Sequence, residues 1–272
     1  MFHEQIITAG RRHFSGEPLL ATIALSDEAV ADEAQMEAVI ERAAEWEVNG
    51  FYVIAETPSS YLVEDPNWLA NLLILASGLK LLRKPVLVGY CNHQMLCLAA
   101  ANVDIVASGT WLNVRAFPTD KFYTPTEDEV SRRTTWYYCP QALSEYTLPF
   151  LDIAMRNGVL DAMRPEPSLG SIYAKALFGG AAPSTVMWGE QNAFRHYLTC
   201  LRKQCAMVTA SSFQGAMESQ RRMLDSAESV MGTLRTQGVF GNDRDFRPIL
   251  DTNRSALIIF GRARGSRLRR EW

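Results

Sequence analysis

Residues 51–90 (FYVIAETPSSYLVEDPNWLANLLILASGLKLLRKPVLVGY) decide the fold class of this chain. The apolar runs at 51–55 and 85–90 are continuous rather than alternating, which is typical of buried parallel strands. Between them, apolar residues dominate 66–82, where Asp65 can cap a helix whose first residue is proline. Two strands joined by such a helix predict one parallel βαβ unit.

The same alternation continues on both sides of this unit. Residues 19–25 (LLATIAL) precede it as a strand, and an amphipathic helix is predicted over 32–48. After it come a short helix over 94–101 and a strand over 104–107, with 111–117 as a further strand or an ordered loop. Strands that alternate with helices predict a parallel sheet with right-handed crossovers.

The order of elements over residues 19–117 looks like a (β/α)-barrel at the level of fold, although no sequence motif carries the likeness. A closed barrel needs eight strands, and this sequence suggests about half of them. We therefore predict a barrel-like or partial-barrel α/β fold, with an open doubly wound sheet as the alternative. The chain divides into a parallel β/α region at 1–118, a mixed loop and helical region at 119–260, and a basic Arg-rich tail at 261–272.

Beyond residue 118 the pattern becomes mainly helical. Residues 255–260 (SALIIF) fit either a strand or the end of a helix. Helices separated by glycine-containing turns are predicted over 141–157, 169–178, 189–208 and 212–236.

Composition excludes several classes of protein. The 272 residues are 47% hydrophobic and 21% charged, which rules out a disordered chain, a collagen-like repeat and a coiled coil. Residues 1–150 carry 10 Lys and Arg against 19 Asp and Glu, a net of −9, whereas residues 151–272 carry 17 against 11, a net of +6. The basic half could meet an anionic partner, or the two halves could attract each other.

Cysteines, leader signals and cofactor motifs give mainly negative information. The five cysteines show no Cys-x-x-Cys spacing and are expected to be reduced and mostly buried. The apolar stretch 68–82 is too short and too polar to span a bilayer, and 1–14 lacks a signal-peptide core, so we expect a soluble cytoplasmic protein. No dinucleotide, phosphate-loop, zinc-peptidase or nucleophile-elbow motif occurs, so no cofactor is predicted. Metal binding stays open, because Asp27, Glu56 and Asp120 could converge on a hard cation.

Polar residues follow each predicted strand, and the carboxyl ends of parallel strands meet at one edge of a sheet. Glu56 follows the second strand and is the predicted acid or base, while His93 after the third is the predicted proton shuttle. Asn92 and Ser108 would position the substrate. Each of these residues could instead cap a helix or complete a turn, so the predicted ring of strand ends is a stronger signal than any single member.

Trp111, Asn113 and Arg115 alternate along the predicted fifth strand. On one face of a strand they would present an aromatic ring, an amide and a guanidinium to a planar substrate with a carbonyl or phosphate group. The alternative is an edge strand whose polar side faces water. We include these three residues among the predicted substrate-binding residues.

The tail is the most polar segment without a packing explanation, and it reads as a mobile cationic arm for nucleic acid or an acidic protein surface. Trp136-Tyr137-Tyr138 after Arg132-Arg133 could add base stacking, although such a cluster more often packs a loop onto the core. The predicted nucleic-acid-binding residues are Arg262, Arg264, Arg267, Arg269 and Arg270.

These features lead to one preferred function and two alternatives. We expect an enzyme that performs cofactor-independent acid–base chemistry on a small polar, ring-bearing molecule, such as a nucleobase, at the strand ends. The first alternative is a protein that binds nucleic acid or modifies bases through its basic half. The second is a structural or assembly protein whose helical half packs against partners or further copies.

Overall fold

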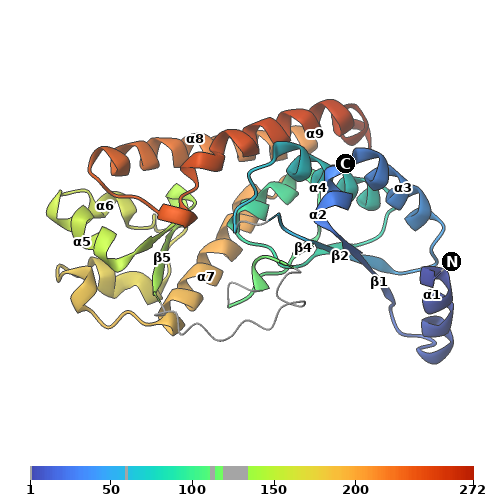
Figure 1. Cartoon of the computed structure of the whole chain (residues 1–272), viewed down its shortest axis with the longest axis horizontal. Coiled ribbons are helices and arrows are strands. Elements are labelled where there is room, and N and C mark those ends of the chain that lie inside the picture. The colour runs from blue at the N-terminus through green and yellow to red at the C-terminus, as the bar shows by residue number, and fades with distance from the viewer. Residues whose placement is uncertain (1, 59–60, 111–113, 119–133) are drawn as a thin grey trace.

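A parallel sheet forms the N-terminal part of this computed structural model, which describes residues 2–58, 61–110, 114–118 and 134–272. Its strands lie side by side in chain order (Figure 1). The parallel β/α architecture predicted from the sequence is therefore confirmed. The strands are β1 (Leu20–Leu25), β2 (Gly50–Ala55), β3 (Val86–Val88) and β4 (Ile105–Val106).

Helices connect the strands where the sequence predicts them. After α1 (Phe2–His13) and β1 come α2 (Asp27–Ala31) and α3 (Glu33–Ala44). The α4 helix (Pro66–Leu81) begins as predicted, because the Asp65 carboxylate accepts a hydrogen bond from the Asn67 N–H at 2.8 Å. The 3-10 helix η1 (His93–Ala101) joins β3 to β4.

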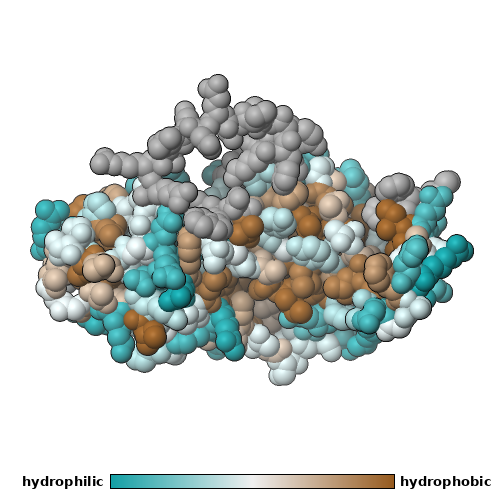
Figure 2. All heavy atoms as spheres, turned by 90° about the horizontal axis from the view of Figure 1, so that it is seen from below, coloured by the Kyte–Doolittle hydropathy of each residue, from teal (hydrophilic) through white to brown (hydrophobic). Residues whose placement is uncertain are grey.

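The two faces of the sheet differ in their covering. Phe51, Val53 and Val86 are fully buried on the face that α4 covers. On the other face, Leu20 and Ile105 at the two edges are about half exposed, at 47% and 52%. In Figure 1 the helices α2–α4 lie on one side of the sheet, and Figure 2, which views the molecule from below, shows apolar surface on the underside.

The described residues form no closed barrel. Four parallel strands with two free edges make an open sheet. A doubly wound sheet reverses its strand order at a switch point, whereas this order runs β1-β2-β3-β4 without reversal. The predicted further strand at 111–117 is also not found in its described part, because residues 114–116 form a turn.

A second group of elements follows the sheet and includes an antiparallel hairpin that the sequence did not reveal. Strands β5 (Trp136–Cys139) and β6 (Ser144–Thr147) flank η4 (Pro140–Ala142), so the helix predicted over 141–157 is wrong in its first half. Only α5 (Leu148–Arg156) matches that helix, with proline in its first turn. The remaining short elements are α6 (Leu160–Met163), η5 (Ile172–Phe178) and η6 (Pro183–Thr185).

Three long helices connect this hairpin region to the sheet. They are α7 (Glu190–Val208), α8 (Phe213–Thr236) and α9 (Leu250–Glu271), and η7 (Asn242–Arg244) and η8 (Arg247–Ile249) lie between the last two. In Figure 1, α8 and α9 run along one side of the molecule, and α9 packs against α4. Buried amides fix η1 to them: Gln94 Nε2 donates to Asn253 Oδ1 at 2.9 Å, and Gln220 Nε2 donates to the Leu96 carbonyl at 2.8 Å.

The predicted mobile arm is instead the last three turns of α9. Leu268 is 2% exposed in the core, and the Trp272 indole N–H donates to the Ala210 carbonyl at 3.3 Å. Arg264 pairs with Glu37 of α3 at 2.5 Å, and Arg267 pairs with Glu271 at 3.1 Å. The segment is a helix because its apolar side packs against the molecule.

None of the helices that the structure describes combines the length and the apolar character needed to cross a membrane.

Candidate active site

The β3–η1 junction places Asn92 and His93 at the carboxyl end of the sheet, as the sequence predicts. The Asn92 side chain caps η1, because its Oδ1 accepts from the Gln94 N–H at 2.9 Å. Its Nδ2 donates to the Tyr61 carbonyl at 2.8 Å. Both polar atoms of the Asn92 side-chain amide therefore form hydrogen bonds to the backbone, so Asn92 has a structural role in this conformation.

His93 is fully buried in an aromatic cluster. Its ring centroid lies 5.1 Å from that of Tyr138 and 5.9 Å from that of Phe246. The Tyr197 hydroxyl is 3.5 Å from Nδ1, and Nε2 has no hydrogen-bond partner among the described residues. Burial lowers the pKa of His93 to about 4, against the opposing effect of the Glu145 carboxylate. At neutral pH His93 is therefore an uncharged imidazole.

The Glu145 carboxylate from β6 is the centre of a buried polar cluster beside His93. It is 3% exposed and accepts a hydrogen bond from the Tyr61 hydroxyl at 3.0 Å. Its other oxygen lies 2.9 Å from Arg244 Nη1 and 3.6 Å from Arg115 Nη1. Burial raises the pKa of Tyr61 well above its usual value, so this phenol stays protonated and donates.

The two arginines of this cluster are held by aromatic rings and backbone carbonyls. Arg115 is 4% exposed, donates from Nε to the Gly109 carbonyl at 3.0 Å, and lies 3.6 Å from the Tyr197 ring centroid. Arg244 lies 4.1 Å from the Trp136 ring centroid and 5.6 Å from that of Tyr61. We call Tyr61, Arg115, Glu145 and Arg244 the arginine cluster.

The arginine cluster carries a net charge of +1, because it contains two guanidinium groups and one carboxylate while the neighbouring His93 is neutral. Arg115 and Glu145 are buried, and the cluster reaches the surface through Arg244, whose side chain is 14% exposed. Planar guanidinium groups bind carboxylate and phosphate oxygens in pairs. The site can therefore hold a small anion next to a neutral imidazole and a phenol.

Glu56, the predicted acid or base, follows β2 and makes a described hydrogen bond at the end of β1. Its Oε2 accepts from the Asp27 N–H at 3.3 Å. Ligand oxygens of Asp27, Glu28 and Glu56 lie within 4.8 Å of one another and could hold a hard divalent cation, although Glu28 is exposed. Burial and the adjacent Glu28 raise the pKa of Asp27. Asp120, the third residue of the predicted cation site, lies outside the described residues.

The structure divides the predicted substrate-binding residues among several environments. Arg115 and Asn92 lie at the arginine cluster and its edge, with His93 beside them. Ser108 instead lines a cavity between η1, β4 and α7. Trp111 and Asn113 lie outside the described residues.

Sequence reasoning missed the residues that complete the site. Glu145, Arg244, Tyr61 and Tyr197 come from a hairpin, a short 3-10 helix, a loop and α7, which the sequence does not relate to the strand ends. One signal was available: Glu145 stands in the segment 142–146 (ALSEY), whose other members are apolar, small or aromatic. A carboxylate in such a segment is buried only with a partner, so it predicts a buried ion pair.

In comparisons with known proteins, no family model, curated protein or solved structure matches the chain.

Proposed function

We propose that this protein is an enzyme that performs cofactor-independent acid–base chemistry on a small, ring-bearing anion at the carboxyl end of its sheet. The observation that carries the proposal is the net positive, mostly buried arginine cluster next to the neutral His93. The site uses the strand ends at which ligands bind in open and closed parallel α/β folds.

The excess charge favours an anionic substrate. Glu145 can neutralise only one of the two guanidinium groups beside it. A buried charge without a counterion is costly, so a carboxylate or phosphate that completes the pairing is stabilised there. Arg244 is the more exposed of the two arginines and is the one that would meet the substrate first.

The surrounding rings favour a planar substrate, and the titratable groups supply proton transfer. Trp136 and Tyr61 flank the Arg244 guanidinium and offer aromatic faces. In the proposed reaction His93 accepts a proton through Nε2, which has no hydrogen-bond partner among the described residues, and the Tyr61 phenol donates a hydrogen bond to developing negative charge. Glu56, the acid or base predicted from the sequence, follows the neighbouring strand β2 and stays a candidate for that role.

Binding of benzoate and of its neutral analogue benzamide tests the charge argument. We expect benzoate to bind and to raise the melting temperature of the protein, and benzamide to bind much more weakly. Arg244→Gln should lower the affinity for benzoate about ten- to a hundredfold, because a charge-assisted hydrogen bond contributes about 1.5–3 kcal/mol. Arg247→Gln is the matched control, since the ion pair that the structure describes for the Arg247 side chain is a 3.5 Å surface contact with Glu228. Equal binding of benzoate and benzamide would overturn the proposed site.

Proton transfer is tested separately by NMR. In D₂O, a working acid–base site should exchange an acidic C–H of a bound ring-bearing carboxylic acid for deuterium. We expect His93→Gln to abolish this exchange and to leave benzoate binding in place. Exchange at the wild-type rate in both His93→Gln and Glu56→Gln would exclude these two residues from the chemistry.

Nucleic-acid binding is the second candidate, and one observation favours it. Arg262, Arg269 and Arg270 are exposed on α9 and make no ion pair with any residue in the described parts of the chain. Such a basic helix face suits phosphate groups. Fluorescence anisotropy with labelled RNA and DNA should then show affinity that falls steeply with salt and is lost when these three arginines are replaced by Gln.

A further inference from the structure

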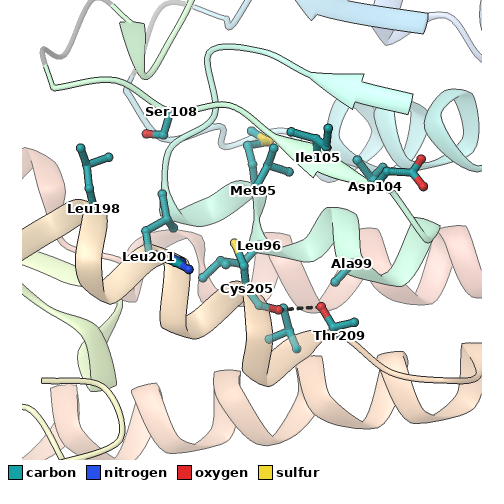
Figure 3. Close-up of a pocket in the computed structure, with 14 residues that line it drawn as sticks. Met95, Leu96, Ala99, Asp104, Ile105, Ser108, Leu198, Leu201, Cys205 and Thr209 are labelled. Carbon is teal, nitrogen blue, oxygen red and sulfur yellow. Dashed lines mark hydrogen bonds between the residues drawn. The ribbon is translucent and has the colours of Figure 1, made fainter. Parts of the chain in front are cut away.

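A cavity of about 400 Å³ lies between η1, β4 and α7, apart from the arginine cluster (Figure 3). No member of the arginine cluster lines it, so the two sites can be tested independently. Its volume falls at the small end of the range for cavities that bind small molecules.

The walls of this cavity are largely apolar. Met95, Leu96 and Ala99 of η1 face Leu198 and Leu201 of α7 across it, and Ile105 closes one side (Figure 3). Ile105 belongs to the edge strand β4 and is 52% exposed. Displacing water from apolar walls lowers the free energy, so the cavity favours a ligand with an apolar body.

Two polar groups at the cavity have no partner in the parts of the chain that the structure describes. The Ser108 hydroxyl oxygen is buried and makes no hydrogen bond to a described residue. Arg202 is exposed and makes no ion pair within residues 2–58, 61–110, 114–118 and 134–272. The other two polar lining residues have partners: Asp104 is neutralised by Lys80 at 2.7 Å and accepts from the Val86 N–H, and the Thr209 hydroxyl donates to the Cys205 carbonyl at 2.8 Å.

We propose that this cavity binds a small amphipathic carboxylic acid. Its apolar chain or ring lies between η1 and α7, and its carboxylate pairs with the Arg202 guanidinium. The charges support an acid rather than a base, because Asp104 is paired and Arg202 is not. A single guanidinium matches one carboxylate through two parallel hydrogen bonds. The Ser108 hydroxyl bonds to a polar substituent where the ligand has one.

The protein carries its own reporter for this site. Cys205 lines the cavity, and it is the one of the five cysteines that is not buried. Cys91, Cys97, Cys139 and Cys200 are all buried. A thiol reagent such as N-ethylmaleimide should therefore modify Cys205 first in the folded protein, and a ligand in the cavity should slow that reaction.

Decanoate and its uncharged analogue decanol are the probes, with binding measured by calorimetry and labelling of Cys205 measured by mass spectrometry. We expect decanoate to bind more tightly than decanol and to slow Cys205 labelling several-fold. Arg202→Gln should reduce the affinity for decanoate about tenfold and leave decanol unchanged. Arg195→Gln, an exposed arginine two turns earlier on α7, is the matched control and should behave as wild type.

Filling the cavity gives a second, charge-independent test. Ala99→Phe should abolish binding of both probes, and circular dichroism checks that this variant folds. If it does not fold, Arg202→Gln, which changes only an exposed side chain, still tests whether the cavity binds the carboxylate. The proposal is overturned if decanoate leaves Cys205 labelling unchanged, if decanol binds as tightly as decanoate, or if Arg195→Gln weakens decanoate as much as Arg202→Gln.

Discussion

Removing the charge of Glu145 is the most direct test of how the arginine cluster is balanced. In Glu145→Gln, Arg115 and Arg244 lose the carboxylate that lies between them, and one of the two is 4% exposed. Breaking a buried ion pair from one side costs about 3–5 kcal/mol, because the remaining charge is left in a poorly solvated place. This loss is a large part of the roughly 5–15 kcal/mol by which a domain is stable.

Urea unfolding followed by tryptophan fluorescence measures this loss. With a slope of about 3 kcal/mol per molar urea, a loss of 3 kcal/mol lowers the unfolding midpoint by about 1 M. The control is Glu47→Gln, since Glu47 pairs with Arg11 on the surface with its side chain 77% exposed, and that pair contributes at most about 1 kcal/mol.

A double-mutant cycle then separates lost charge balance from lost packing. Glu145→Gln combined with Arg115→Met returns the cluster to its original net charge of +1, with the remaining guanidinium on the more exposed Arg244. We expect the double variant to be more stable than the sum of the single losses by at least about 1 kcal/mol. Strictly additive losses, or a Glu145→Gln midpoint equal to that of Glu47→Gln, would refute the charge argument.

Two further predictions concern pH and the C-terminal helix. Burial lowers the pKa of both His93 and His196 to about 4, so between pH 4 and 6.5 the unfolded chain binds more protons than the folded chain. The stabilisation from the two neutral histidines is therefore complete above pH 6.5 and should fall by about 2 kcal/mol per histidine between pH 6.5 and 5. Urea midpoints of a His93→Gln/His196→Gln variant should decline clearly less over the same pH range. Deleting residues 261–272 should lower stability by at least about 2 kcal/mol, because Leu268 is 2% exposed in the core, whereas a free arm could be removed without changing the unfolding midpoint.

The sequence predicted those parts of the fold whose signals are local. For α4, an aspartate cap, a proline at the first residue and an unbroken apolar run determine the helix, and the structure matches the predicted start. The starts of α7 and α8 also agree within one residue: α8 begins after a Ser212 side-chain cap, whereas α7 begins after Gly189 without one. The β5–β6 hairpin was missed because its strands are four residues each, and so short an apolar segment has no readable period.

Sheet closure was beyond local signals as well. Each predicted β/α unit looks the same whether its sheet closes, reverses direction or ends in a free edge. These cases differ in whether the edge strands β1 and β4 each pair with a second neighbouring strand, and among the described residues neither of them does. The pattern of the units therefore predicted a parallel sheet correctly and left its closure open.

The candidate site shows the same division between local and distant information. Asn92 and His93 could be selected because they follow a predicted strand, and Arg115 because it alternates with Trp111 and Asn113 within one. Glu145 lies 99 residues before Arg244, and their 2.9 Å contact depends on how the hairpin and η7 pack against the sheet. A pairing of that range needs coordinates or related sequences, and the arginine cluster therefore emerged only from the structure.

The arginine-rich composition of the C-terminal segment led to a wrong structural prediction, because the segment is part of helix α9 and not a mobile arm. Five arginines in a short glycine-containing stretch predict a solvated arm, yet Phe260, Gly265 and Leu268 place one side of that stretch against the core. Arg262, Arg269 and Arg270 thereby become a fixed basic face, on which a nucleic acid would have to match three set positions. Truncation would confuse binding with stability, so replacing these three exposed arginines with Gln is the decisive experiment. Unchanged stability together with lost, salt-sensitive RNA binding would support the nucleic-acid function, and unchanged binding would exclude this face.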